Sequence, residues 1–334
     1  MKRIYLMAVT TIISMTVWAQ NIAVVSPGNS TSIYQTLGDA ITGATPGSTI
    51  YLPGGGFQIS DETLIDKKLT IMGVSHRGDT DNVDGATIIA GNLNYVKGAS
   101  GSAILGVYLT GNINVGTETD SVLNLTIRYC NANSIQVKHS QSSGMVVNQC
   151  YLRGNSNLGY SNAEITNCIT APIEKVNGGT FIHNIVLGQY NESNGSWAWS
   201  LGIKEVCSSN VTGNIFSCRV QSTINYGRTL KDGVPNCTGS NNYGAEWGDN
   251  PISIEVGMAD FFMKWNNGAI SPASNFHFKD EYKEYESQVG IYAGSTPFRD
   301  DKSLAPIPRI VSKKVDEQTD GSGKLKVEVK VKAN

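Results

Sequence analysis

The stretch Thr126-Ile127-Arg128-Tyr129-Cys130 recurs in outline about twenty residues later, and this recurrence decides the fold. Each copy is an apolar run that ends in a polar residue followed by a small or apolar one. Repeats of this length bury their apolar faces only against their neighbours, so the sequence predicts a solenoid. The copies end in Tyr129-Cys130, Gln149-Cys150, Asn167-Cys168, Asn184-Ile185, Asn214-Ile215 and Asn242-Tyr243, at steps of 20, 18, 17, 30 and 28 residues.

Three of the six cysteines hold the same place in consecutive repeats. We expect Cys130, Cys150 and Cys168 to stack as small buried thiols in adjacent coils, about 4.8 Å apart. A disulfide between Cys218 and Cys237, 19 residues apart and outside this column, is the alternative use of cysteine.

A column of asparagines is expected at one turn of the solenoid. Asparagine tolerates left-handed backbone, and its amide can bond to the next coil. The predicted members are Asn167, Asn184, Asn214 and Asn242.

The N-terminal region predicts a cap and a first coil. Residues 33–42 place apolar side chains at helical spacing, with Ser30, Thr31 or Ser32 available as the N-cap. Three strand-like runs follow at 48–53, 54–59 and 68–73. A small helix, then Pro-Gly-x-Thr-Ile-x-Leu-Pro and then Leu-Thr-Ile-x-Gly, resembles the start of the right-handed parallel β-helix proteins of the pectate-lyase-like superfold. The fold class that this resemblance implies is all-β: a right-handed parallel β-helix with an N-terminal capping helix.

The C-terminal region predicts two further features. Residues 276–298 resemble the closing coil of the same family of secreted bacterial proteins. Beyond them, residues 309–315 and 324–331 alternate apolar and charged side chains around Asp320-Gly-Ser-Gly323, which predicts a β-hairpin. We therefore expect a β-helix domain at 20–303 and a C-terminal hairpin extension at 304–334.

The first 19 residues have the pattern of a signal peptide. Lys2 and Arg3 precede an apolar stretch from Ile4 to Val17, and a small residue, Ala19, marks the expected cleavage site. No segment approaches the roughly 20 apolar residues of a membrane helix. We expect an exported protein of a Gram-negative bacterium, in the periplasm, on the cell surface or outside the cell.

Charge makes some partners poor candidates. The chain has 26 Lys and Arg against 28 Asp and Glu, and loss of Lys2 and Arg3 would make the net charge about −4. The repeats contain no basic block, so nucleic acid is an unsuitable partner. We expect a monomer that meets a polysaccharide or another glycan.

Candidate catalytic residues follow the repeat marks by a few residues. Lys138, His139, Glu174 and Lys175 are expected on one face with Asn157, where a lysine or histidine could take the α-proton of a uronic acid. The alternative is an ordinary solvated face. The Arg-x-Pro-x-x-Arg signature of pectate lyases is absent, as are the polygalacturonase segments Asn-Thr-Asp and Gly-His-Gly.

A hydrolase would need two facing carboxylates. Glu164, Glu174, Glu192 and Glu205 are available, but nothing in their spacing pairs them.

A cation site is a weaker hypothesis. Asp79, Asp81 and Asp84 concentrate carboxylates in a short segment, as calcium loops do. Val83 stands where a ligand belongs, so a polar turn is the alternative. Calcium is the one cofactor that the sequence suggests.

The two long steps between repeats predict loops on the solenoid surface. The first loop spans 189–202 and contains Tyr190, Trp197 and Trp199. Aromatic side chains on an exposed loop can hold sugar rings, and the alternative is that they pack down on the solenoid. The sequence thus favours a β-helix protein that binds or scaffolds glycans. A polysaccharide lyase or glycoside hydrolase acting on an acidic polysaccharide is the second hypothesis.

Overall fold

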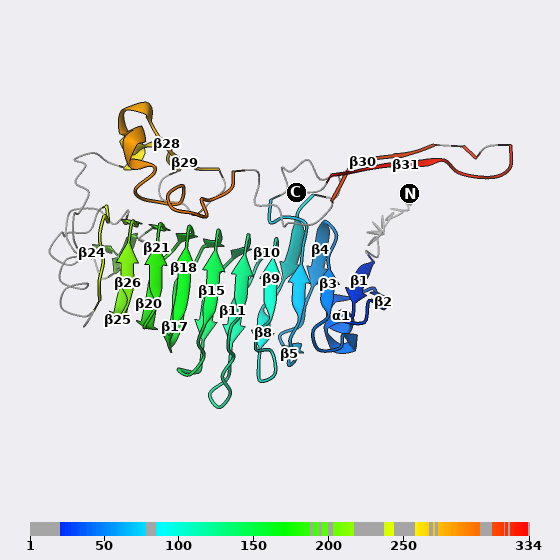
Figure 1. The fold of residues 1–334 in the computed structure, drawn as a ribbon, viewed down its shortest axis with the longest axis horizontal. Helices are drawn as coiled ribbons and strands as arrows, with labels where there is room; N and C mark the ends of the chain where they lie inside the picture. Colours follow the sequence, from blue (N-terminus) through cyan, green and yellow to red (C-terminus); the bar gives the residue numbers. More distant parts are fainter. Residues whose placement is uncertain are drawn as a thin grey trace, which may run out of the picture.

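The protein is a parallel β-helix, shown along its length in Figure 1. The computed structural model describes residues 21–77, 85–187, 190–193, 196–199, 203–216, 237–243, 258–266, 270, 273–300, 309–316, 318–319 and 321–332. Three sheets run the length of the solenoid, and each coil contributes one strand to each sheet. This confirms the predicted fold class. A right-handed sense is the one that connections between parallel strands almost always have.

Sheet A contains ten strands, of which the first two are antiparallel to their neighbours and the rest are parallel. One column of aliphatic residues and a phenylalanine points inward along it, from Ile50 through Ile127 and Ile165 to Val211. In spatial order the strands are β2 Thr31–Tyr34, β1 Ile22–Val25, β3 Thr49–Tyr51, β6 Thr70–Met72, β9 Ala103–Leu105, β12 Thr126–Arg128, β15 Met145–Asn148, β18 Ala163–Thr166, β21 Thr180–Ile182 and β26 Asn210–Thr212.

Sheets B and C complete each coil. Sheet B consists of β27 Ile215–Phe216, β22 Ile185–Val186, β19 Ile169–Thr170, β16 Tyr151–Leu152, β13 Asn131–Ala132, β10 Tyr108–Leu109, β7 Thr87–Ala90 and β4 Gly55–Gln58. Sheet C consists of β25 Ile203–Cys207, β20 Ile173–Asn177, β17 Ser156–Ser161, β14 Ile135–Val137, β11 Ile113–Val115, β8 Leu93–Tyr95 and β5 Leu64–Ile65.

The N-terminal cap differs in detail from its prediction. Helix α1 spans Leu37–Gly43 and begins at the N-cap Thr36, whose hydroxyl accepts a hydrogen bond from Asp39 N–H at 3.1 Å. Ile33 lies in strand β2 and is 55% exposed. The prediction of a helix from 33, capped by Ser30, Thr31 or Ser32, was therefore wrong at its start, because the chain first pairs with β1 as an antiparallel strand.

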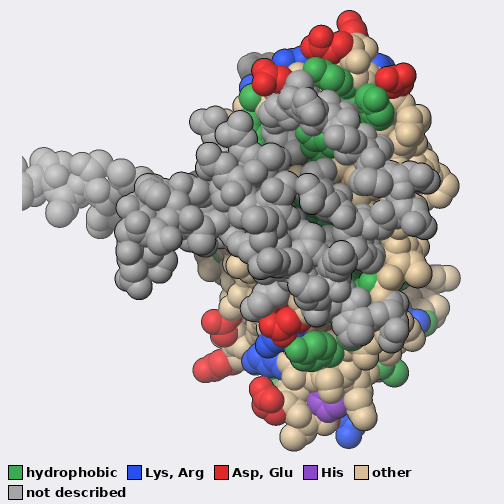
Figure 2. All heavy atoms as spheres, turned by 90° about the vertical axis from the view of Figure 1, so that its left-hand side faces the viewer, with side chains coloured by type: hydrophobic (Ala, Val, Ile, Leu, Met, Phe, Trp, Pro, Cys, Tyr) green, Lys and Arg blue, Asp and Glu red, His purple; other side chains and the backbone are tan. Residues whose placement is uncertain are grey.

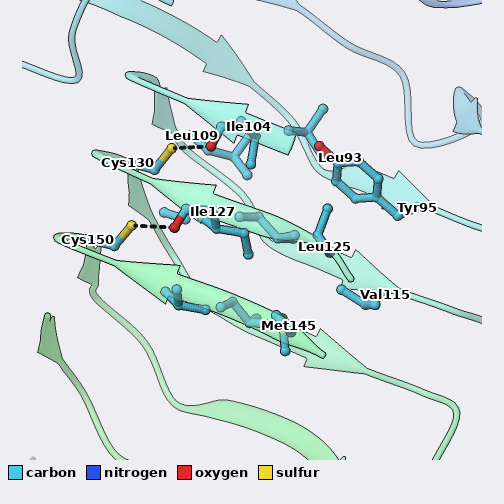
Figure 3. Close-up of a cluster of buried hydrophobic side chains, with 14 of the residues drawn as sticks. Leu93, Tyr95, Ile104, Leu109, Val115, Leu125, Ile127, Cys130, Met145 and Cys150 are labelled. Carbon is cyan, nitrogen blue, oxygen red and sulfur yellow. Dashed lines mark hydrogen bonds between the residues drawn. The ribbon is translucent and has the colours of Figure 1, made fainter. Parts of the chain in front are cut away.

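The repeated dipeptide forms the turn between sheets A and B. Its first residue is left-handed, with φ 54° at Tyr129, 53° at Gln149 and 51° at Asn167. Its second residue points into the core, where Cys130 and Cys150 donate to Ile104 O and Ile127 O of the preceding coil (Figure 3). The predicted cysteine stack is confirmed, and the three thiols are buried and free.

The predicted asparagine column was wrong by one residue at Asn167. Ile169 pairs with Ile185, so Asn184 is the equivalent of Cys168 and not of Asn167. The interior column thus runs through the three cysteines and continues as Asn184, Asn214 and Asn242. Asparagine does there what the thiol does: Cys150 N–H donates to Cys168 Sγ at 3.4 Å, and Cys168 N–H to Asn184 Oδ1 at 2.9 Å.

The C-terminal part of the chain does not add a closing coil, which corrects the expectation for residues 276–298. Instead, α3 Met258–Phe261, β28 Phe262–Lys264, β29 Asn275–Phe278, the 3₁₀ helix η2 Asp280–Tyr285 and the chain as far as 300 pack outside the solenoid. We call residues 273–300 the return segment, because in Figure 1 it runs back along the axis. The C-terminal part packs there because the outward face of sheet B is apolar. Residues Tyr151, Ile169, Ile185, Ile215 and Tyr243 form a second apolar cluster with phenylalanines of the C-terminal part.

The left-handed residues of the repeat hold this return segment. Gly290 N–H donates to Gly213 O at 2.8 Å, and the Asn167 amide donates to Ile291 O and Ala293 O at 2.8 and 2.9 Å. Further along, Arg299 N–H donates to Gln149 Oε1 at 3.0 Å. The return segment therefore runs opposite to the order of the coils. At Gln149 and Asn167 the first residue of the dipeptide binds this segment, and the second residue points into the core.

The last element is the predicted hairpin, β30 Arg309–Val315 with β31 Val327–Lys332 in antiparallel register. In the described structure these two strands pair only with each other. Figure 1 shows the hairpin extending past the end of the solenoid at which β1, β2 and α1 lie.

Candidate functional site

A strip of amide side chains follows the outer face of sheet C. Its members occupy paired positions on successive strands, are partly exposed, and bond to one another or to nearby backbone. The Asn114 amide donates to Asn94 Oδ1 at 2.7 Å, and the Asn157 amide donates to Glu174 Oε1 at 3.2 Å. We call this the amide strip, and it consists of Asn94, Asn114, Gln136, Asn157 and Glu174.

A second ladder, of asparagines, borders the amide strip at the turn between sheets B and C. Asn112 N–H donates to Asn92 Oδ1 at 2.7 Å, and Asn133 donates to Asn112 Oδ1 at 2.8 Å. Sequence reasoning missed both features. The signal was present, since Gly91-Asn92-Leu93-Asn94 returns twenty residues later as Gly111-Asn112-Ile113-Asn114.

The structure brings only some of the predicted catalytic residues together. Asn157 and Glu174 are in contact, and Lys175 follows Glu174 within β20. Lys138 and His139 lie beyond the end of β14, and strand β17 separates them from β20. Two strand spacings are about 10 Å, so Lys138 and Lys175 do not form one basic pair.

A bulge in sheet C places three polar residues at equivalent positions. The register shifts between Asn157 and Ser161, and Tyr160, Lys175 and Glu205 all have left-handed backbone, with φ of 62°, 58° and 52°. The Tyr160 hydroxyl donates to Glu205 Oε2 at 2.7 Å. This bond raises the pKa of Tyr160, because it favours the protonated phenol.

The carboxylates that a hydrolase would need lie on two sheets. Glu164 is exposed on sheet A, and Glu174 lies on sheet C. Glu205 lies on β25, the strand next to that of Glu174, and is bonded to Tyr160. Glu164 is therefore on a different sheet from the other two.

The first long insertion forms a hairpin beside the solenoid. Strand β23 Tyr190–Ser193 pairs antiparallel with β24 Ser196–Trp199, and Tyr190 is opposite Trp199 while Glu192 is opposite Trp197. The hairpin is inserted between β22 of sheet B and β25 of sheet C, and Figure 1 shows β24 at the end of the solenoid where β26 lies.

Other predicted sites lie outside the described residues. They are the calcium ligands Asp79, Asp81 and Asp84, the signal peptide, and Cys218 of the alternative disulfide. Elsewhere, across the residues that the structure does describe, no group of three His, Cys, Asp or Glu side chains could hold a metal ion.

One ionic cluster that the sequence did not suggest lies in the return segment. His277 bonds to Glu286 and to Asp300, each at 2.6 Å, and its ring stacks on Tyr292 with centroids 3.8 Å apart. Burial alone would raise the pKa of Glu286, but hydrogen bonds from Lys283, His277 and a backbone N–H lower it below its usual value. The arrangement joins β29 to the end of the segment, and this is a structural role. In the view onto the end of the solenoid, acidic, basic and apolar side chains lie together at the top of the molecule (Figure 2).

Comparison with known proteins does not name a family. No family model, no curated protein and no solved structure matches this chain. None of the helices in the described parts of the chain has the length and apolar character that crossing a membrane requires.

Proposed function

We propose that this protein is an exported β-helix protein that binds a glycan along the outer face of sheet C. The observation that carries the proposal is the amide strip, which ends on β20 next to strand β25, and the hairpin β23–β24 with Tyr190, Trp197 and Trp199 directly precedes β25 in the sequence. The proposal includes the resemblance to secreted bacterial proteins of the pectate-lyase-like superfold, and export by the signal peptide at 1–19.

The chemistry of the strip suits sugar hydroxyls. Each asparagine amide has two donors and an acceptor with two lone pairs, and the bonds within the strip use only part of this capacity. Asn94, Asn114 and Asn157 are only partly buried, so their remaining polar atoms can reach a ligand. Aromatic residues on a hairpin add rigid apolar area for the faces of sugar rings at little cost in conformational entropy.

The length of the strip favours a polymer over a single sugar. Its five positions lie on consecutive strands, and four spacings of about 4.8 Å amount to roughly 19 Å. Affinity should therefore rise with the length of an oligosaccharide until the chain spans the strip. Equal affinity for a monosaccharide and a long oligomer would contradict this arrangement.

The test compares binding with folding. Trp197→Ala combined with Trp199→Ala should weaken glycan binding by about 1 to 3 kcal/mol and leave the melting temperature nearly unchanged. Asn114→Ala should weaken binding as well. The control is Tyr51→Ala, which removes an exposed aromatic residue from sheet A. Lost stability with unchanged binding would show that the tryptophans pack on the solenoid wall.

A lyase acting on an acidic polysaccharide is the second candidate, and the bulge in sheet C is the observation that favours it. Lys175 and Tyr160 are possible bases, and they occupy equivalent left-handed positions beside Glu174. The same glycan screen should record unsaturated products by their ultraviolet absorbance. Product formation that is lost in Lys175→Ala or Tyr160→Phe would establish the lyase, whereas binding without any product would support the binding protein.

A further inference from the structure

The hairpin β30–β31 has an apolar face that nothing in the described structure covers. Val327, Val329 and Val331 alternate along β31 and are 52%, 48% and 57% exposed, and Val315 is opposite Val327. An isolated two-stranded hairpin is marginally stable in water, so a surface that covers this face would stabilise it. The hairpin is also basic, since residues 309–332 contain seven Lys and Arg against four Asp and Glu.

The N-terminal cap has the complementary properties. Residues 21–68 contain four acidic residues, Asp39, Asp61, Glu62 and Asp66, against two basic residues, Lys67 and Lys68. Ile33 is exposed in β2, and β2 is the end strand of sheet A. An unpaired strand edge can accept another strand, and main-chain hydrogen bonds would then supply affinity.

We propose that the hairpin of one copy of this protein docks on the N-terminal cap of a second copy, along the open edge of β2. Opposite net charge and two exposed apolar surfaces favour the contact. Figure 1 shows the hairpin reaching outward past the cap of its own solenoid, in the direction where the cap of another copy could be met. If the two copies exchange hairpins about a two-fold axis, both hairpins and both β2 edges are covered and the assembly closes as a dimer.

This inference is independent of glycan binding and differs from the monomer that the sequence led us to expect. The amide strip lies on sheet C, and the proposed contact uses the end of sheet A and the hairpin. Failure of one proposal therefore leaves the other standing.

The experiment is sedimentation equilibrium of the mature chain over a range of concentrations. We expect a dimer whose dissociation constant rises with salt, because the surfaces have opposite charge. Ile33→Thr in the cap, or Val327→Thr with Val329→Thr in the hairpin, should raise that constant at least tenfold. Threonine keeps the β-branched shape, and circular dichroism verifies folding.

Two controls make the assignment specific. Leu123→Thr removes an exposed apolar residue outside both surfaces, and Lys97→Glu reverses an exposed charge outside both. Neither should change the dimer.

Mixing the cap variant with the hairpin variant tests which surfaces meet. Each variant alone loses both contacts of the dimer, but the mixture retains one intact cap and one intact hairpin, so a heterodimer should form. A monomer at every concentration would overturn the proposal. Dimerisation of Ile33→Thr as strong as that of the unaltered protein would also overturn it, because hairpins would then meet hairpins.

Discussion

Replacement of Asn184 tests how the interior column holds adjacent coils together. Asn184 is fully buried; its Oδ1 accepts from Cys168 N–H at 2.9 Å, and its amide donates to Ile165 O at 2.8 Å. Leucine has a similar size but no polar atoms, so Asn184→Leu leaves these two backbone groups without their partner. Each buried unsatisfied group costs about 1 to 3 kcal/mol, which predicts a loss of about 2 to 6 kcal/mol in the free energy of unfolding.

Asn184→Cys is the informative partner of this substitution. Cys168, one coil away, already accepts an N–H at 3.4 Å and donates its thiol to Val147 O at 3.6 Å. A thiol at 184 can make the same two weaker bonds, so the loss should be below about 2 kcal/mol.

Urea unfolding followed by circular dichroism measures both losses, and hydrogen exchange at the Cys168 amide reports the local effect. The control is Asn177→Leu, on an exposed asparagine, and it should change little. Equal losses for leucine and cysteine at 184 would refute the view that hydrogen bonding, and not shape, specifies this column.

Three further predictions concern other parts of the molecule. Gly294→Ala should loosen the return segment, because an added Cβ would lie 2.6 Å from the His183 ring, and faster proteolysis would report this. The control Gly323→Ala has similar left-handed strain (φ 78°) but nothing within 4 Å of the added Cβ, so it should destabilise the protein less. Ile165→Asp should prevent folding of the coils around it, since a charge would be buried without a partner at a site with no exposed surface; unchanged thermal melting of a soluble variant would contradict this. The pKa of Glu286 is lower in the folded protein than its ordinary value of 4.5. The contribution of Glu286 to stability is therefore complete above about pH 4.5 and is lost as the pH falls through the folded pKa. In Glu286→Gln, the melting temperature should depend less on pH over that range.

The strands of the β-helix could be predicted from sequence because their signal is local. The predicted runs 48–53 and 68–73 contain the strands β3 and β6. The one-residue error in the predicted register at Asn167 has a physical cause. Cysteine and asparagine fill the same interior place because each can accept one backbone hydrogen bond and donate another. Their interchange between Cys168 and Asn184 is invisible to a search for apolar periodicity.

Contacts that depend on distant parts of the chain could not be predicted in this way. Residues 276–298 resemble a closing coil in sequence, but their partner is the outer face of sheet B, whose apolar column was not recognised as lying outside. The asparagine Asn167 was assigned to a ladder, yet its amide binds the return segment more than 120 residues later in the chain. The amide strip was missed because its repeat lies on a different sheet from the one that the cysteines mark.

The covering of sheet B decides where a ligand can bind. The return segment and the phenylalanines beside it occupy the outer face of that sheet over the later coils. In the described part of the chain, the apolar cluster of the return segment involves sheet B and not the outer faces of sheets A and C. The outward positions of sheet A alternate among side chains without a common chemistry, such as Thr126, Val146 and Glu164, which are paired with one another. Sheet C instead has a planar polar side chain, an amide or a carboxylate, at the equivalent position of five consecutive strands. The insertion that contains Trp197 and Trp199 comes immediately before the last strand of this sheet in the sequence. This repetition is why we propose a polymer with repeating hydroxyl groups as the ligand.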